Sequence, residues 1–175
     1  MTIIVNDTLQ LALIAPVHAQ AVYDLVVANR EYLRPWLGWV DNMKDVGFIE
    51  QFIRNCEQSH LNGTDHAFVI LENGAVVGRI GVYKIDTYNR IGEIGYWIAA
   101  DAQGRGLITQ ACQATIQYCF ETLQLNRIEI KCAVENTKSQ AVPERLGFTK
   151  EGILHQAEFL HGKFVDLVLY AKVRV

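Results

Sequence analysis

The chain has 175 residues, half of them apolar and a fifth charged, which is the composition of a globular protein large enough to bury a core. Its formal net charge of −3 disfavours a general nucleic-acid-binding protein, which would carry a basic surface. No apolar run approaches the roughly 20 residues of a membrane span, and the start of the chain lacks the pattern of a signal peptide. We therefore expect a cytoplasmic protein that binds neither nucleic acid nor membrane.

The first third of the chain is predicted to be a strand followed by two helices. Residues 8–14 alternate in polarity like a strand, and Pro16 suits the first turn of a helix that ends before Pro35. The stripe expected to face inward from this helix is Val17, Ala21, Val22, Leu25 and Val26. A loop rich in aromatic residues follows over 30–42. Asp45 can then cap a second helix that ends at Asn62-Gly63.

The middle of the chain predicts a hairpin and a parallel crossover. Two apolar strands within 66–86 flank Asn73-Gly74, a strong hairpin signal. A further strand over 90–100, a glycine-rich loop, a helix over 107–123 and a strand over 127–134 form one βαβ unit.

The last part predicts a short helix ending near Gly147, then two strands, 154–160 and 164–173, around the turn His161-Gly162. We therefore predict one α/β domain over residues 1–175. Its sheet would be mixed and mostly antiparallel, with about seven strands, flanking helices and one parallel crossover.

Cysteine and histidine give no sign of a metal site. The four cysteines form no C-x-x-C pair and sit in apolar runs, so we expect buried, reduced thiols: Cys56, Cys112, Cys119 and Cys132. The five histidines also lack metal-ligand spacing, and no metal is expected.

The glycine-rich loop "AADAQGRGLITQA", residues 99–111, raises the question of phosphate binding. It lacks the Walker A pattern, and Thr109 stands where a dinucleotide fingerprint needs its third glycine. The remaining alternatives are a tight turn that needs glycine and an anion site at a helix start. In the second case Gly104 and Gly106 admit the ligand, Arg105 adds positive charge, and the N–H groups of about Arg105 to Thr109 point at the anion.

Two motifs resemble the GNAT family of N-acetyltransferases. "QGRGLIT" resembles its acetyl-CoA loop, with Gln103 and Gly106 in place, and "NTKSQAVPERLGF" resembles its N-x-x-S…L-G-F segment. "EIGYW", "NRIEIKC" and "LHQAEFLHGKFVDLVLYA" are similar to the branch that acetylates the N-terminal serine of a ribosomal stalk protein. Ile108 departs from the general pattern of glycine or alanine, but it too matches this branch.

The resemblance implies acetyl-CoA as the cofactor and a set of residues that contact it. The implied set is Ile98, Gln103, Gly104, Arg105, Gly106, Leu107, Ile108, Thr109, Asn136 and Ser139. A backbone N–H near Ile98 would stabilise the oxyanion, where the strand splays from its neighbour.

Glu158 is the candidate general base. It alternates with Leu154, Gln156 and Leu160, so its carboxylate would lie among less polar neighbours, which would raise its pKa. The resemblance implies the same role, whereas an exposed strand glutamate is the alternative. Glu93 is the second candidate base, with a cross-strand ion pair as its alternative.

Ser139 is the candidate donor to the leaving thiolate, by resemblance, and a helix-start hydroxyl is the alternative. Because Pro143 lacks an N–H and its ring crowds the carbonyl four residues back, we expect a kinked or shortened helix that leaves the Ser139 carbonyl free for a ligand.

Four residues are candidates for the acceptor side of the site: Trp36, Trp39, Glu93 and Tyr96. For the aromatic loop, packing between helices is the alternative. Of Tyr96 and Trp97, one is expected to face the site and the other the core.

The sequence thus favours acetylation of the N-terminal α-amine of a ribosomal protein. An α-amine, with a pKa near ~7.7–8.0, is more often neutral at pH 7 than lysine, with ~10.4. The alternatives are acetylation of a polyamine or other small amine, and a non-catalytic CoA-binding domain. The closing hairpin or an edge strand offers a surface for a homodimer.

Overall fold

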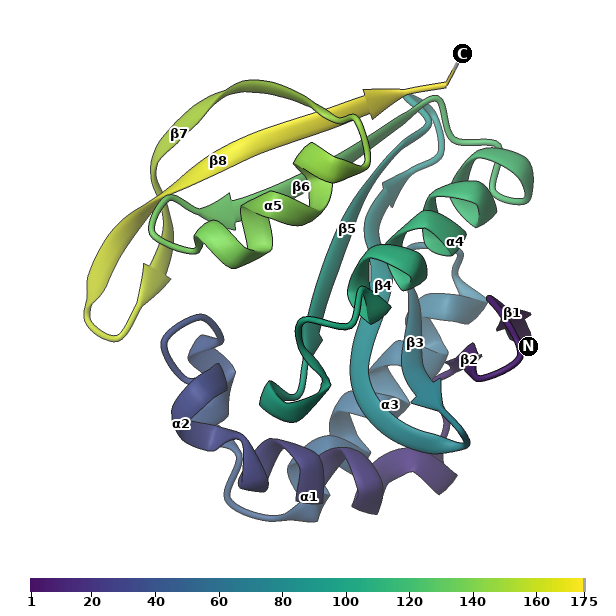
Figure 1. The fold of residues 1–175 in the computed structure, drawn as a ribbon, viewed down its shortest axis with the longest axis vertical. Helices are drawn as coiled ribbons and strands as arrows, with labels where there is room; N and C mark the ends of the chain where they lie inside the picture. Colours follow the sequence, from purple (N-terminus) through teal and green to yellow (C-terminus); the bar gives the residue numbers. More distant parts are fainter. Residues whose placement is uncertain (175) are drawn as a thin grey trace.

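The structure, a computed structural model, describes residues 1–174. Eight strands form one sheet in the order β1-β2-β3-β4-β5-β6-β8-β7, and every neighbouring pair is antiparallel except β5 and β6 (Figure 1). The strands are β1 (Thr2–Ile4), β2 (Leu9–Leu13), β3 (His66–Glu72), β4 (Ala75–Asp86), β5 (Ile91–Ile98), β6 (Arg127–Ala133), β7 (Thr149–Leu160) and β8 (Lys163–Val173). This confirms the predicted fold class, with β1 as the strand that the prediction lacked.

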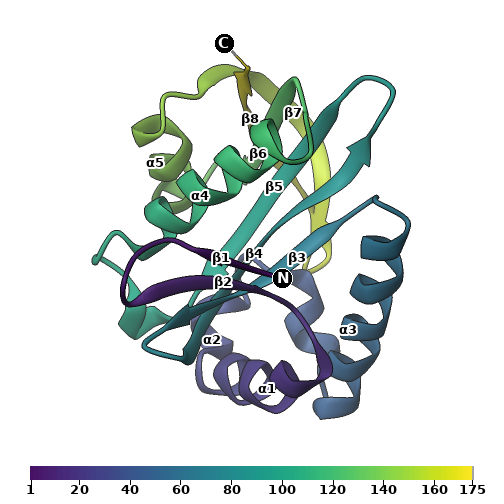
Figure 2. The same cartoon turned by 90° about the vertical axis from the view of Figure 1, so that its right-hand side faces the viewer.

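Helices cover both faces of the sheet. They are α1 (Ala19–Ala28), α2 (Arg30–Leu33), α3 (Val46–Leu61), α4 (Leu107–Glu121) and α5 (Thr137–Arg145), with short 3-10 turns at Pro16–His18 (η1), Gly38–Asn42 (η2) and Ala100–Ala102 (η3). Figure 2 shows α4 and α5 on one face and α1 to α3 on the other. None of the helices in the described part of the chain has the length and apolar character that a membrane crossing requires.

Each face of the sheet packs its own apolar core. Strand residues such as Phe68 and Ile80 are fully buried against α4, while Val69 points to the other face and packs with Val22 and Ile53 of α1 and α3. Burying each aliphatic side chain of this kind contributes about 1.5–3 kcal/mol. The alternation of side chains along β3 therefore fixes which helices lie on which face.

The first predicted helix differs from the structure. Asn29 interrupts it, with φ −112° and ψ 15°, and its side-chain amide donates to the Leu25 carbonyl, which ends α1. Val17, expected on the inward stripe, is 83% exposed because it lies in the preceding 3-10 turn. Ala21 is also exposed. The loop predicted over 30–42 instead contains α2 and η2.

The parallel pair β5–β6 opens a gap in the sheet. The two strands pair only over Ile91–Glu93 and Arg127–Glu129, and beyond these residues they diverge. The splay that the resemblance implied is therefore present. It leaves the far end of β5 without a neighbour on one edge, while β4 stays paired with it up to Ile98.

A buried polar contact between α4 and the sheet predicts how the stability of the fold depends on pH. The Tyr118 hydroxyl and the Nδ1 atom of His60 lie 2.9 and 3.1 Å from Nδ1 of His66, which is 7% exposed. Burial, and then the neighbouring His60 ring, lower the pKa of His66 below its usual value. The His66 imidazole therefore binds a proton more readily in the unfolded chain than in the folded protein. The folded state keeps its full stability above pH ~6.5 and loses the contribution of neutral His66 as the pH falls below that value.

We expect His66→Gln to flatten the loss of unfolding free energy between pH 7 and 5, measured by urea denaturation at a series of pH values. His155→Gln is the control: it removes only a solvent-exposed ion pair with Asp166, which contributes little to stability, so its profile should stay close to that of the wild type. Parallel profiles for His66→Gln and wild type would show that His66 does not carry the effect.

Candidate active site

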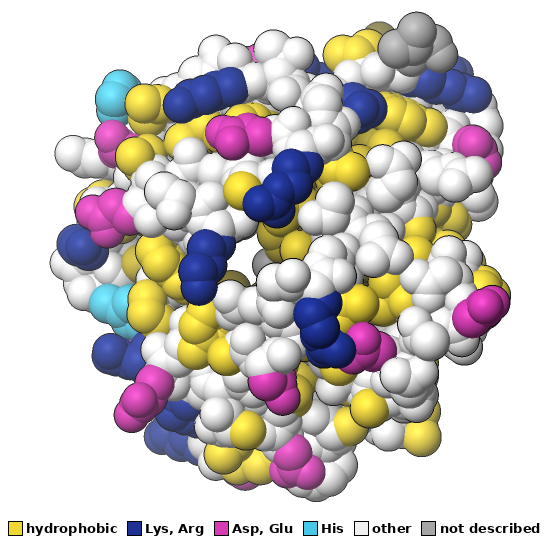
Figure 3. Space-filling view, viewed as in Figure 1, with side chains coloured by type: hydrophobic (Ala, Val, Ile, Leu, Met, Phe, Trp, Pro, Cys, Tyr) yellow, Lys and Arg dark blue, Asp and Glu magenta, His cyan; other side chains and the backbone are white. Residues whose placement is uncertain are grey.

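A cavity of about 1220 Å³ occupies the gap between β5 and β6. It is lined by α2 and the residues after it (Tyr32, Leu33, Trp36, Leu37), by the end of β5 (Ile94 to Ile98), by the loop before α4 and its first turn, by the end of β6, by α5, and by Glu158 of β7. Figure 3 shows a central hollow with basic side chains around it. Its lining comes from elements on both faces of the sheet, α2 on one and α4 and α5 on the other.

The loop before α4 forms one wall. Gly104 and Gly106 have φ values of +73° and +74°, a conformation that residues with a Cβ rarely adopt. Gly106 is the N-cap of α4, so the next N–H groups, of Leu107, Ile108 and Thr109, begin the helix without partners from a preceding turn. These three residues line the cavity, and the helix dipole favours an anion there. The geometry therefore fits a diphosphate, as expected from the sequence.

Arg105 does not lie in this wall. Its guanidinium forms a two-point ion pair with Glu72 of β3, with N–O distances of 3.0 and 2.9 Å. Of the described residues, it is not among those that line the cavity. The expectation that Arg105 adds charge to the anion site is therefore wrong for its side chain. Three basic residues that sequence reasoning missed line the cavity instead: Lys131, Lys138 and Arg145. Lys138 donates to the side chain of Gln103 at 3.2 Å.

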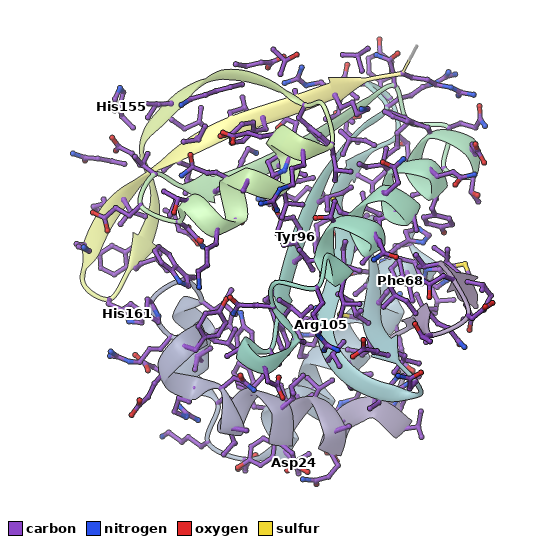
Figure 4. All side chains as sticks on the ribbon, viewed as in Figure 1. Asp24, Phe68, Tyr96, Arg105, His155 and His161 are labelled. Carbon is purple, nitrogen blue, oxygen red and sulfur yellow. The ribbon has the colours of Figure 1, made fainter. Side chains whose placement is uncertain are left out.

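A hydroxyl cluster lies between β5, β6 and α5. The Tyr96 hydroxyl donates to the Ser139 carbonyl at 2.8 Å, and the Ser139 hydroxyl lies 3.2 Å from the Cys132 sulfur and 3.4 Å from the Tyr96 oxygen. Figure 4 shows Tyr96 beside the central opening. Burial raises the pKa of Tyr96, which keeps its proton on this bond. The Ser139 hydroxyl contacts only the weakly polar Cys132 sulfur and, at the long distance of 3.4 Å, the Tyr96 oxygen, so its proton is the more available of the two.

Pro143 explains why Tyr96 binds at this point. The proline has no N–H to offer the Ser139 carbonyl, so that carbonyl accepts from Tyr96 instead. The helix continues through Pro143 to Arg145, and the carbonyl is occupied. Pro143 thus leaves the Ser139 carbonyl without a donor four residues further on, as predicted, but Tyr96 and not a ligand occupies it, and the helix is not shortened. Asn136 caps α5 by accepting from the Ser139 N–H at 3.2 Å, while also lining the cavity.

Glu158 lies in the cavity wall as a half-buried carboxylate, and the side-chain contacts found in residues 1–174 give it no hydrogen-bond partner. Burial, and then the charge of Glu93, raise the pKa of Glu158. Its strand carries a bulge: residues 155–157 stand opposite Asp166 alone, and Gln156 adopts φ +51° with its N–H bound to Asp166. Gln156 is exposed, so the predicted alternation fails there, although Leu154 and Glu158 remain paired with Leu167 and Val165.

Two acceptor-side candidates lie outside the cavity lining. Glu93 accepts from Lys131 at 2.8 Å and from Lys84 at 3.2 Å. Burial would raise the pKa of Glu93, but the two lysines outweigh it and lower that pKa. Trp39 stacks on Phe48 with ring centroids 6.4 Å apart. Both thus match the alternatives stated for them, an ion pair and helix packing.

Trp36, Tyr96 and Trp97 all line the cavity. Tyr96 reaches Ser139 inside the cavity, whereas Trp97 packs with the core of α1 and α3 and lies 6.4 Å from the Trp39 ring. The two side chains therefore divide between site and core as the sequence led us to expect.

The end of β5 offers a backbone donor at Ile98. The Ala99 N–H binds Val77 on β4 at 2.9 Å, and Ile98 faces Gly78 on the same strand. Since successive N–H groups in a strand alternate between its edges, the Ile98 N–H points away from β4, toward the gap.

This arrangement is that of an acetyltransferase. The GNAT acetyltransferase domain matches residues 8–149, and the chain belongs to this family. The expectation that acetyl-CoA is the cofactor is confirmed for the family, because its solved members include complexes with CoA and acetyl-CoA.

Particular relatives support the predicted branch. The ribosomal-protein-serine acetyltransferase of Escherichia coli is 34% identical over 172 residues, 98% of this chain and 96% of the relative. RimL, a ribosomal L7/L12 alpha-N-protein acetyltransferase solved with coenzyme A in a cysteine disulfide, is 29% identical, covers 99% of this chain and 98% of its own, and has a TM-score of 0.95. The microcin C7 self-immunity acetyltransferase MccE, solved with acetyl-CoA and AMP, is 30% identical, covers 97% and 94%, and has a TM-score of 0.92.

Proposed function

We propose that this chain, acting as one domain, transfers the acetyl group of acetyl-CoA to the N-terminal α-amine of a ribosomal protein that begins with serine. The support is the similarity to ribosomal-protein acetyltransferases along nearly the whole chain, together with a cavity lined by elements from both faces of the sheet. A ribosomal acceptor places the reaction in the cytoplasm. The edge strand β7 offers a surface for a homodimer.

The charges of the cavity favour this acceptor over a polyamine. Three basic side chains line it (Lys131, Lys138 and Arg145), of which Lys131 is paired with Glu93 and Glu129, against one carboxylate, Glu158. The lining therefore lacks the excess of acidic groups that would attract a polycation. Spermidine acetyltransferases also match less of the chain, with 30% identity over 53% of it for the Vibrio cholerae enzyme. This balance of charge is the observation that carries the choice of acceptor.

The proposed reaction uses the residues of the two walls. Acetyl-CoA supplies an activated thioester, whose diphosphate fits the N–H groups at the start of α4. Glu158 takes the proton from the attacking amine, and the Ile98 N–H stabilises the oxyanion. The Ser139 hydroxyl donates to the departing thiolate. The cysteine–CoA disulfide in RimL agrees with a thiol end near Cys132, which lines this cavity 3.2 Å from Ser139.

An acetyl-CoA turnover assay tests the proposal. Thiol release should be fast with a peptide that begins with serine, slower with alanine first, and absent when the same serine peptide has a blocked N-terminus but an internal lysine. Faster turnover of spermidine would favour the small-amine alternative. CoA binding without thiol release from any amine would favour a non-catalytic domain.

A further inference from the structure

The tip of the β7–β8 hairpin touches the segment that follows α2, on the acceptor side of the cavity. Figure 4 shows His161 at this tip, beside α2. Its Nε2 atom lies 2.6 Å from the Arg34 carbonyl oxygen, and its Nδ1 lies 3.3 Å from the Asp41 carboxylate. Leu160 packs on Gly38, where an added Cβ would stand 3.2 Å from Leu160 Cδ2. The hairpin and this segment thus meet at polar and apolar contacts.

The segment that receives His161 is held together internally. Arg30 donates to the carbonyls of Val40 and Met43 at 2.8 and 2.7 Å, and Arg34 donates to Asp41 at 2.7 Å. These bonds tie residues 30–43 together, and this segment carries Trp36. The hairpin carries Glu158, three residues before His161. The contact at His161 therefore joins the segment that carries Trp36 to the strand that carries Glu158.

Asparagine is a more usual first residue than histidine at this turn. His161 and Gly162 have φ values of +48° and +82°, the pattern of a type I′ hairpin turn, in which asparagine is the favoured first residue. The same chain uses Asn73-Gly74, with φ values of +50° and +82°, between β3 and β4. Replacing His161 by asparagine would therefore relieve the turn. The imidazole does what asparagine cannot, because it reaches the Arg34 carbonyl.

We propose that His161 is a positioning residue: its bond to the Arg34 carbonyl fixes the strand that carries Glu158 against the segment that carries Trp36. This inference rests on the proposed function, since it concerns the acceptor side of that site. It assigns the hairpin tip a role in catalysis through Glu158 and no contact with the reacting atoms.

Two variants separate this role from a purely structural one. His161→Asn favours the turn but is too short to reach Arg34, whereas His161→Gln places an amide N–H near the position of Nε2 and strains the turn. We expect His161→Asn to keep or raise Tm and to lower kcat/KM for the acceptor peptide roughly tenfold, the value of one hydrogen bond. His161→Gln should lower Tm and keep kcat/KM near wild type. The KM for acetyl-CoA should not change in either variant.

His155→Asn is the matched control, because His155 lies on the same hairpin but away from the tip (Figure 4). The proposal would be overturned if kcat/KM followed Tm, so that His161→Gln were less active than His161→Asn. It would also be overturned if kcat/KM were unchanged in all three variants. The rate of amide hydrogen exchange in residues 34–42, measured without substrate, tests the His161–Arg34 contact separately from activity. This rate should rise in His161→Asn even if serine peptides prove not to be acceptors, so a failure of this proposal can be told apart from a failure of the proposed function.

Discussion

Replacing Glu158 with glutamine should lower kcat/KM for a serine-starting peptide roughly 100- to 10,000-fold, the range that a general base contributes. The variant keeps the shape of the side chain but cannot accept a proton. Because Glu158 has no hydrogen-bond partner among the side-chain contacts of residues 1–174, no buried partner is left unsatisfied by the change, and the fold should persist. The affinity for CoA, measured by calorimetry, should stay within about twofold, since the carboxylate is proposed to act on the amine alone.

The pH dependence of kcat/KM tests the role of Glu158 as a base more specifically than the loss of activity does. Burial raises the pKa of Glu158, and the reaction needs both its carboxylate and a neutral amine, so kcat/KM depends on two ionisations. The logarithm of kcat/KM should rise with a slope of about two at pH values below both pKa values and with a slope of about one between them. In Glu158→Gln the slope should be about one throughout.

Glu151→Gln is the matched control for Glu158. The same chemical change falls on the same strand, at a carboxylate paired with Arg127 at 2.6 Å outside the cavity. It should leave kcat/KM and the slopes unchanged. If Glu93→Gln abolished turnover while Glu158→Gln did not, the base would be Glu93, held ionised by Lys131 and Lys84.

Local patterns predicted most of the fold. Alternation, apolar runs and turn signals together located seven of the eight strands, and Asn73-Gly74 and His161-Gly162 both form turns with positive φ, as expected. β1, of only three residues, is too short for its alternation to be recognised. The break at Asn29 depends on one side chain that competes for a helix carbonyl, and propensity alone does not show whether such competition wins.

The site was predictable where it depends on the backbone and less so where it depends on side-chain partners. Gly104, Gly106 and the start of α4 follow from the loop itself. The pairing of Arg105 with Glu72 joins residues 33 positions apart, and nothing near Arg105 in the sequence announces it. Likewise, Tyr96 fills the carbonyl that Pro143 leaves open only because β5 lies beside α5. Such contacts follow from tertiary packing, and the spacing of residues in the sequence does not predict them.

Replacing Gly106 with valine should weaken CoA binding by roughly 100-fold or more, through loss of charge-assisted bonds of about 1.5–3 kcal/mol each. At φ +74° a β-branched residue costs about 1–2 kcal/mol, which a stable domain survives, although Tm will fall. The protein itself leaves room for a Cβ here, since only the flexible Gln110 side chain lies within 4 Å, at 3.8 Å. The expected loss of affinity therefore comes from the diphosphate that we propose to bind at this turn, and not from a clash of the added Cβ with the protein.

Gly63→Val is the control that separates the backbone strain of a valine at positive φ from the loss of contacts with CoA. Gly63 lies in the turn after α3 with φ +71° and has nothing within 4 Å of an added Cβ, so it shares the strain of Gly106 but not its position. Both variants should lose similar Tm, and only Gly106→Val should lose affinity for CoA in calorimetry. Equal affinities in the two variants would mean that Gly106 serves the turn alone. A loss confined to Gly106→Val would instead show that this loop conformation, set by a residue without a side chain, is what lets the backbone of α4 reach the cofactor.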